Sequence, residues 1–334
     1  MKIVMIGNTN VGKTTYMASL YGIMQQQVEG FSLKAINTND HARLYELAQA
    51  IAHDNYPSAT DQRGEYDFFL QHQGKDIFAF RWADYRGGAI KEKQTSEQAS
   101  LLIKDLREAD GIMMFCDCDA LMRGDIRANE IRRMTTLVTQ ALRDVEKPIS
   151  LAIILSKTDK ISQFSEKLIS PFEGLIGVIN ASDWVIGAFI PIACGKHFMN
   201  VPLPLLFTLY AAVYVQAYVA QDLAQKSYDR AIQWQQKSQG IEGFFRWVGD
   251  KWNGNPTDEE LAQQEFAAYL EHSQKLEFIK DPVLALASYL ENIPWMQNGK
   301  TLLDYAQACG TLKFYHQFSG AINRKYRDPF DLFS

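Results

Sequence analysis

Eight residues near the start of the chain have the types and the spacing of a phosphate-binding loop. The segment Gly7-Asn8-Thr9-Asn10-Val11-Gly12-Lys13-Thr14 fits the pattern G-x-x-x-x-G-K-S/T and stands between a strand-like and a helix-like stretch. In this context backbone N–H groups wrap a phosphate, and the N-terminus of the following helix adds the positive end of its dipole. The alternative is an ordinary strand-to-helix turn with an exposed lysine.

The motif gives each of its polar groups an expected role. Lys13 is expected to reach the β- and γ-phosphates, which also makes it a catalytic candidate, and the Thr14 hydroxyl is expected to ligate Mg²⁺. The sequence therefore predicts a site for a nucleoside triphosphate with Mg²⁺. The predicted nucleotide-binding residues of this loop are Gly7, Asn10, Val11, Gly12, Lys13, Thr14 and Thr15.

Three later segments bear on which base is bound. Asp84-Tyr85-Arg86-Gly87 ends a predicted strand, where a carboxylate can hold Mg²⁺ through water and a glycine N–H can meet the γ-phosphate. Ser156-Lys157-Thr158-Asp159 follows another strand, and its carboxylate can accept both N–H groups of guanine while the lysine stem covers the base. In Ala193-Cys194-Gly195-Lys196 a backbone N–H can receive the guanine carbonyl. The predicted base-binding residues are Ser156, Lys157, Asp159, Ala193 and Cys194.

Around these motifs the chain alternates strand-like and helix-like patterns, which is typical of a parallel sheet covered by helices. The predicted strands are 2–6, 111–116, 150–155 and 188–193, and the predicted helices are 13–27, 40–53, 96–107, 127–145 and 166–179. Residues 65–72 and 75–83 are predicted as two strands joined by a tight turn at Gln73-Gly74, so they should be antiparallel.

This ordered set of motifs resembles the Ras-like GTPases of the translation-factor class, over about residues 1–198. The early helix before Tyr56-Pro57-Ser58-Ala59-Thr60 is similar to that of the bacterial double-GTPase families. The resemblance implies GTP or GDP as the ligand and makes Thr60 the switch threonine that touches Mg²⁺ and the γ-phosphate; taken alone, Thr60 is only a loop threonine. The metal ligands it implies are Thr14, Thr60 and Asp84, and the catalytic residues are Lys13, Thr60, Arg86 and Gly87.

Two positions depart from the pattern of these relatives. Their base-recognition motif usually begins with Asn or Thr, whereas this chain has Ser156, which predicts weaker guanine affinity. Gly88 stands where many relatives have the glutamine that orients the attacking water, so hydrolysis by that route is excluded. Arg86 can supply positive charge to the transition state, or it is a solvated loop arginine.

Composition and length set the broad class. The chain has 334 residues, of which 47% are hydrophobic and 22% charged, with a net charge of −5, so it is globular and lacks the basic excess of a nucleic-acid binder. We expect two domains, a Ras-like P-loop domain over 1–198 with a mostly parallel sheet flanked by helices, and an all-helical extension over 199–334. Four cysteines do not form a disulfide framework, and no secretory signal opens the chain, so a cytoplasmic protein is expected.

The helical extension holds two segments that bear on membranes and partners. Residues 203–220 are largely apolar, but prolines, a glutamine and tyrosines favour a buried helix docked on a sheet over a membrane span. Residues 244–252 are rich in aromatic and basic side chains, which fit either a membrane or partner contact or, as we favour, a hairpin tip. Helix starts are predicted at Thr257, Asp281-Pro282 and Thr301.

Together these features predict a GTP-binding molecular switch. GTP with Mg²⁺ would order the loops at Thr60 and at residues 84–88, and slow hydrolysis would release them. Through these switch loops and the helical extension, the protein would control a protein partner or respond to an activator. The rival hypothesis is a nucleotide-binding scaffold that hardly hydrolyses. Lys13, Thr14 and Asp84 favour the switch, and Gly88 favours the scaffold.

Overall fold

The chain folds into two compact units. The computed structural model describes residues 1–58, 63–85, 88, 97–143, 146–194, 197–237 and 256–316. One unit combines residues 1–212 with the described residues from 288 onward, and the other is Val213–Ala287. These units do not follow the expected boundary at residue 198, because the residues just after it and those after 288 pack with the sheet-containing unit. Each unit is described by itself.

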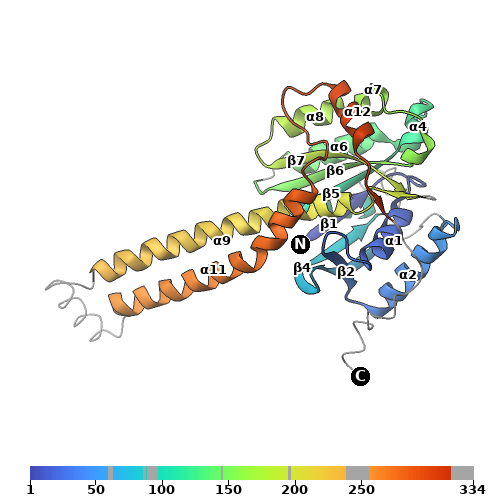
Figure 1. Cartoon of the computed structure of the whole chain (residues 1–334). Helices are drawn as coiled ribbons and strands as arrows, with labels where there is room; N and C mark the ends of the chain where they lie inside the picture. The colour runs from blue at the N-terminus through green and yellow to red at the C-terminus, as the bar shows by residue number, and fades with distance from the viewer. Residues whose placement is uncertain are drawn as a thin grey trace. The chain divides into compact units, whose positions relative to one another are not determined.

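A seven-stranded sheet in the order β2-β3-β4-β1-β5-β6-β7 forms the centre of the first unit (Figure 1). Its strands are β1 (Lys2–Ile6), β2 (Phe31–Ala35), β3 (Gly64–His72), β4 (Lys75–Asp84), β5 (Gly111–Asp117), β6 (Ile149–Ser156) and β7 (Val185–Pro191). Strand β3 is antiparallel to both of its neighbours, β2 and β4. The other neighbouring pairs in the sheet, β4–β1, β1–β5, β5–β6 and β6–β7, are parallel. The mostly parallel α/β sheet expected from the sequence is therefore confirmed.

Burial explains the composition of these strands. Every residue of β5 and of β6 is buried, as expected for continuous apolar strands covered on both faces. The turn between β3 and β4 uses Gln73 at φ 51° and Gly74 at φ 78°, the left-handed conformations that a two-residue hairpin requires. The predicted antiparallel pair is confirmed, whereas strand β2 was missed.

Helices connect the strands. In the first unit they are α1 (Lys13–Met24), α2 (Thr38–Ala52), α3 (Glu97–Glu108), α4 (Cys118–Met122), α5 (Ile126–Asn129), α6 (Ile131–Leu142), α7 (Glu166–Ile169), α8 (Glu173–Asn180) and α12 (Leu302–Thr311), with short 3₁₀ turns at η2 (Thr158–Lys160) and η3 (Ser170–Phe172). Two predicted helices are each divided. Glu130, at φ 49°, separates α5 from α6, and the turn containing Pro171 separates α7 from α8.

The helices cover both faces of the sheet (Figure 1). On one face, α3, α6, α8 and α12 pack with side chains of β1, β5 and β6 in one apolar cluster, which includes Leu106, Met134 and Tyr305. On the other face, the Tyr16 ring of α1 lies 5.2 Å from the ring of Phe115 and 6.1 Å from that of Trp82. The two apolar layers hold β1 and β5 in place, and the predicted phosphate loop follows β1 directly.

The first turns of α9 (Leu203–Lys237) lie against the same face as α1. The Ser150 hydroxyl donates to the Thr208 carbonyl at 2.9 Å, and the Leu205 N–H donates to the Tyr16 hydroxyl at 3.2 Å. A Cβ atom at Gly111 would lie only 2.1 Å from Thr208 Cγ2, so glycine allows this close approach. The predicted docking of this apolar segment on the sheet is confirmed for these turns. Among the described residues, no helix has the length and apolar character needed to cross a membrane.

The residues after 288 complete the first unit with a small second sheet. Strands β8 (Ala193–Cys194), β9 (Phe198–Met199) and β10 (Tyr315–His316) form it in the order β10-β9-β8. An expectation of helix alone beyond residue 200 is therefore wrong at β10. Asn200 connects the parts, since its side-chain amide donates to the Leu312 carbonyl and its oxygen accepts from the Phe314 N–H.

The second unit contains the remaining turns of α9 and most of α11 (Asp258–Tyr289), which lie side by side (Figure 1). The Tyr228 ring lies 5.5 Å from that of Tyr269, and Arg230 pairs with Glu265 at 3.1 Å. Thr257 and Glu260 form the predicted capping box of α11. The predicted helix start at Asp281-Pro282 is wrong, because Pro282 lies inside α11.

Candidate functional site

The segment between β1 and α1 is a tight loop whose shape depends on its two glycines. Gly12 precedes α1 in the left-handed region, at φ 94° and ψ 17°, where a side chain would strain the backbone. A Cβ atom at Gly7 would lie 2.8 Å from Val11 Cγ2 and 2.9 Å from the Phe115 Cβ, so only glycine fits there. The two glycines therefore allow a tight loop, and α1 begins directly after it at Lys13.

Lys13 lies at the middle of this loop. Its ammonium donates to the Gly7 carbonyl at 2.8 Å and to the Asn8 carbonyl at 3.2 Å, and the residue is only 8% exposed. Burial lowers the pKa of Lys13, and the negative charge of Asp84 opposes that change. The structure thus holds a buried cation next to the N-terminus of a helix, an arrangement suited to an anionic phosphate.

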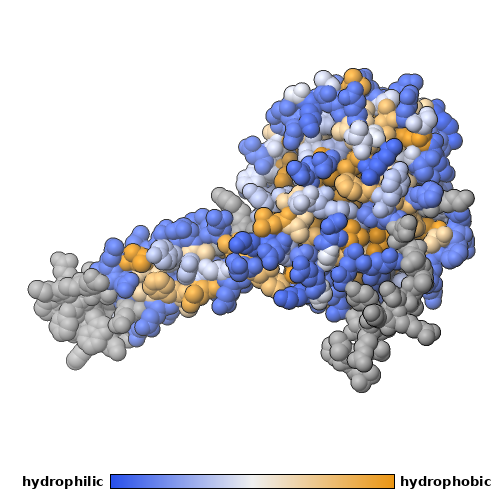
Figure 2. All heavy atoms as spheres, viewed as in Figure 1, coloured by the Kyte–Doolittle hydropathy of each residue, from blue (hydrophilic) through white to orange (hydrophobic). Residues whose placement is uncertain are grey.

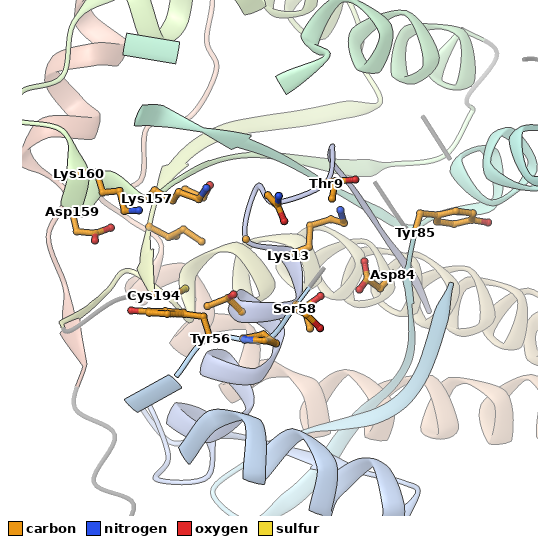
Figure 3. Close-up of a pocket in the computed structure, with 17 residues that line it drawn as sticks. Thr9, Lys13, Tyr56, Ser58, Asp84, Tyr85, Lys157, Asp159, Lys160 and Cys194 are labelled. Carbon is orange, nitrogen blue, oxygen red and sulfur yellow. The ribbon is translucent and has the colours of Figure 1, made fainter. Parts of the chain in front are cut away.

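Asp84 is the last residue of β4 and faces Lys13 (Figure 3). It is 5% exposed, and its Oδ1 atom is one of the buried polar atoms with no hydrogen-bond partner among the described residues. Burial raises the pKa of Asp84 to about 6, although the charges of Lys13 and Arg43 lower it. A buried carboxylate oxygen without a partner needs a cation or water to satisfy it, so the site fits a hydrated Mg²⁺.

The predicted base-binding segment begins where β6 ends. The Ser156 hydroxyl donates to the Val11 carbonyl at 2.7 Å and lies 3.0 Å from the Cys116 carbonyl, so this serine joins the phosphate loop to the neighbouring strand. Lys157 has φ 58°, and its ammonium pairs with Asp117 at 2.6 Å. Asp159 is exposed on the pocket wall and is available to a base.

Two residues to which the sequence alone assigns no role support this arrangement. Asp117 not only pairs with Lys157 but also caps α4, accepting from the Ala120 N–H at 3.1 Å. The side-chain amide of Asn8 donates to the Ala128 carbonyl at 2.7 Å, which ties the phosphate loop to α5. An aspartate that ends a strand and precedes a helix is an N-cap signal, so Asp117 could have been found; the partner of Asn8 could not.

These segments surround one pocket with a cavity volume of about 310 Å³ (Figure 3). Besides the segments above, its wall contains Tyr56, Pro57 and Ser58, which precede the predicted switch threonine, and Cys194 at the end of β8. Burial raises the pKa of the Cys194 thiol to about 12, so this thiol is protonated at neutral pH. Lys157 and Asp159 lie at one end of the pocket and Asp84 at the other, with Lys13 between them (Figure 3).

The structure brings together most of the predicted site residues. Those that line the pocket are Asn10, Gly12, Lys13, Thr14, Thr15, Asp84, Ser156, Lys157, Asp159 and Cys194. Gly7, Val11 and Ala193 shape the loop and strand beside it instead of lining it. Thr60, Arg86 and Gly87 lie outside the described residues, as do Gly195, Lys196 and the aromatic cluster at 244–252.

Comparison with known proteins identifies the family to which the chain belongs. The sequence model described as Double-GTPase 2 matches residues 2–173, just over half of the chain. The chain belongs to the Double-GTPase 2 family. The region that matches the Double-GTPase 2 model contains the phosphate loop, Asp84 and the Ser156–Asp159 segment, and it ends before Ala193 and Cys194.

One solved structure gives a more distant similarity. The chain is similar to the GTPase-like domain of S. cerevisiae Ski7, in a crystal structure bound to GTP, with 16% sequence identity and a TM-score of 0.38. The similarity covers 58% of this chain and 42% of that one, so it spans less than half of the Ski7 chain. No curated protein matches this member of the Double-GTPase 2 family.

Proposed function

We propose that this Double-GTPase 2 member binds GTP with Mg²⁺ in the cytoplasm, hydrolyses it slowly and acts as a molecular switch. The observation that carries the proposal is that the buried ammonium of Lys13 and the buried carboxylate of Asp84, one oxygen of which has no partner among the described residues, influence each other electrostatically at the N-terminus of α1. A buried cation, a helix N-terminus and a carboxylate form one end of a pocket, which matches what a triphosphate and its metal require.

The proposed contacts divide the nucleotide between the two ends of the pocket. The N–H groups of residues 10–15 and the ammonium of Lys13 would bind the phosphates. Asp159 would accept the two N–H groups of guanine, the stem of Lys157 would cover the base, and backbone at Ala193 and Cys194 would receive the guanine carbonyl. Because the Ser156 hydroxyl donates to the phosphate loop, we assign Ser156 to fixing the position of the base-binding segment relative to that loop, instead of to contacting the base directly.

Mg²⁺ would be held by Thr14, Thr60 and Asp84. When bound, it would neutralise charge on the β- and γ-phosphate oxygens. The chain contributes a carboxylate that is ionised above a pH of about 6, because the pKa of Asp84 is about 6. The same buried carboxylate stabilises the charge of Lys13 at neutral pH.

Slow hydrolysis is proposed because Gly88 has no side chain with which to orient a water. We assign Thr60 and the N–H of Gly87 to the γ-phosphate, and Arg86 to charge that develops in the transition state. The rival scaffold hypothesis predicts no phosphate release from saturating GTP over hours. The switch hypothesis predicts measurable phosphate release over the same hours, at a rate near or below about 10⁻³ per second.

The proposed switch would act on a protein partner. Loops on either side of Thr60 and after Asp84 would change with the nucleotide, and α9 and α11 would add a contact surface. Exposed apolar side chains occur on the second unit, among them Leu270, Phe278 and Leu284, and orange surface is visible on the helix pair (Figure 2). The net charge of −5 argues against nucleic acid as the partner.

Calorimetric titration tests the proposed ligand. Wild-type protein with Mg²⁺ is expected to bind GTP and GDP and to bind ATP far more weakly. Lys13→Ala should abolish triphosphate binding, because the phosphates lose their buried cation. Lys275→Ala, an exposed lysine of the other unit, is the matched control and should bind as wild type does. Equal affinity for ATP and GTP would refute the guanine assignment, and unchanged GTP affinity in Lys13→Ala would refute the phosphate site.

A further inference from the structure

A buried carboxylate on α3 joins the two segments that border the candidate nucleotide pocket. Asp105 is 3% exposed, and three donors from different parts of the chain converge on it. The Lys2 ammonium lies 2.6 Å from Oδ1, the Arg63 guanidinium lies 2.6 Å from Oδ2, and the Tyr85 hydroxyl donates to Oδ2. Of these four residues, only Tyr85 lies in a motif with an expected chemical role, and no role is expected there of Tyr85 itself.

Tyr85 is fixed at both of its ends. Its backbone N–H donates to the Met5 carbonyl of β1 at 3.3 Å, and its hydroxyl donates to Asp105. Tyr85 borders the pocket, but its ring points away from Lys13, whereas the Asp84 carboxyl points toward Lys13 (Figure 3). Because the two residues are consecutive, fixing the Tyr85 ring on the side away from Lys13 also keeps the Asp84 carboxyl directed toward Lys13.

Arg63 ties the other segment to the same carboxylate. It immediately precedes β3, whose first residue, Gly64, pairs with Asp84. Its guanidinium lies 5.0 Å from the centre of the Tyr85 ring, a cation–π distance, and bonds to Asp105. Arg63, directly before β3, and Tyr85, directly after β4, are therefore anchored at the same carboxylate.

The three donors around Asp105 stabilise its ionised form. Burial raises the pKa of Asp105, but hydrogen bonds from Lys2, Tyr85 and Arg63 outweigh burial and hold it below its usual range. Asp105 is therefore ionised at neutral pH and makes charge-assisted bonds, which are shorter and stronger than neutral ones. Loss of the charge would weaken all three contacts together.

We propose that Asp105 is a positioning residue for the metal site: by holding Tyr85 and Arg63 together, it keeps Asp84 directed into the pocket and couples the two bordering segments. The inference rests on the proposed function, since it assigns Asp84 to Mg²⁺. Asp105 does not contact the nucleotide. Its effect should therefore be confined to the metal and leave the phosphate-loop contacts of Lys13 intact.

The test measures how Mg²⁺ slows the release of a fluorescent GDP analogue, by titrating Mg²⁺ and recording the midpoint for wild type and for Asp105→Asn. Residues that orient a metal ligand usually contribute about 10- to 100-fold to metal affinity. We expect the Mg²⁺ midpoint to rise by about tenfold in Asp105→Asn. Release in EDTA should stay close to the wild-type rate, because the phosphate loop is unaltered. A merely structural role would instead speed release equally with and without Mg²⁺.

Two further variants complete the test. Tyr85→Phe removes a single hydroxyl and should shift the midpoint in the same direction, and it carries the test if Asp105→Asn does not fold. Asp304→Asn is the control: the Asp304 carboxylate accepts from the Thr301 N–H at 2.7 Å at the start of α12, and none of its hydrogen bonds involves Lys2, Arg63, Tyr85 or Asp105, so the midpoint should stay unchanged. An unchanged midpoint in both Asp105→Asn and Tyr85→Phe, or equally faster release in EDTA, overturns the inference alone. Loss of GDP retention or of Mg²⁺ dependence in wild type overturns the proposed function as well.

Discussion

Asp84 should stabilise the proposed ligand complex while destabilising the free protein. Its carboxyl is 5% exposed and its pKa is raised from an ordinary 3.8 to about 6, chiefly by burial. A carboxyl whose pKa is higher in the folded state binds more protons there than in the unfolded state, so the free energy of unfolding falls as pH rises. The loss begins near pH 3.8 and is complete above about 6. The substitution Asp84→Asn keeps the shape and removes the ionisation.

The size of the effect follows from the two pKa values. Because each pKa unit is worth about 1.4 kcal/mol, the ionised Asp84 costs the folded state about 3 kcal/mol above pH 7. At pH 4.5 the same linkage gives a cost of only about 1 kcal/mol. The attraction to Lys13 is already included in the pKa of about 6, but the new side-chain amide is itself a buried polar group, which takes back part of the gain. We therefore expect the variant to be more stable at pH 8 by about 1–2 kcal/mol, and by less at pH 4.5.

Urea denaturation in EDTA at several pH values, without nucleotide, measures this difference. Asp159→Asn is the control, since Asp159 is an exposed carboxylate of the same pocket and its loss should change stability by less than about 0.5 kcal/mol. In saturating GTP and Mg²⁺ the order should reverse, because ligand binding stabilises wild type more than the variant. The reasoning is refuted if Asp84→Asn is less stable than wild type at pH 8 in EDTA, or if the difference between them does not depend on pH.

Two further substitutions test the base site and the packing beneath it. Asp159→Asn should lower the affinity for guanine nucleotides and shift the preference toward xanthine nucleotides by up to roughly 10⁴-fold, because Asn presents a donor to the xanthine carbonyl. A competition titration with both nucleotides measures this preference. An unchanged preference would show that Asp159 does not recognise guanine. Gly111→Ala should lower the free energy of unfolding by about 1–3 kcal/mol, since the new Cβ would lie 2.1 Å from Thr208 Cγ2. Adding Thr208→Ser removes Cγ2 and should restore part of the lost stability in thermal denaturation. No restoration would contradict the close approach of Gly111 and Thr208.

Features that depend on neighbouring residues could be predicted from the sequence. The left-handed Gly12 before α1, the Gln73-Gly74 turn and the capping boxes at Thr257 and Thr301 all involve groups within a few residues of each other. Their conformations follow from local chemistry, such as the absence of a Cβ or a hydroxyl within reach of a backbone N–H. The alternation of apolar strands and helices likewise predicted a mostly parallel sheet, and with it the edge where the motifs meet.

Local patterns failed where burial or distant partners override propensity. Strand β2 contains a lysine and a serine and was missed, yet it is stabilised by pairing with β3. A proline would ordinarily mark a helix start, but Pro282 lies inside α11. Residues after 288 return to the sheet-containing unit, which composition does not indicate, because the Pro294 carbonyl accepts from the Phe189 N–H of β7.

Only the tertiary structure decided which side chains support the predicted site. Lys157 reaches Asp117 from 40 residues away, Arg63 reaches Asp105 from 42, and Asn8 reaches the Ala128 carbonyl from 120. The motif residues themselves were readable because the chemistry of phosphate and base restricts their types and spacing. Their supporting partners were not, because any acidic or amide side chain can serve once the folded chain brings it within hydrogen-bond distance. That proximity is set by the position of β5 in the sheet and by the packing of α3 and α5 beside it.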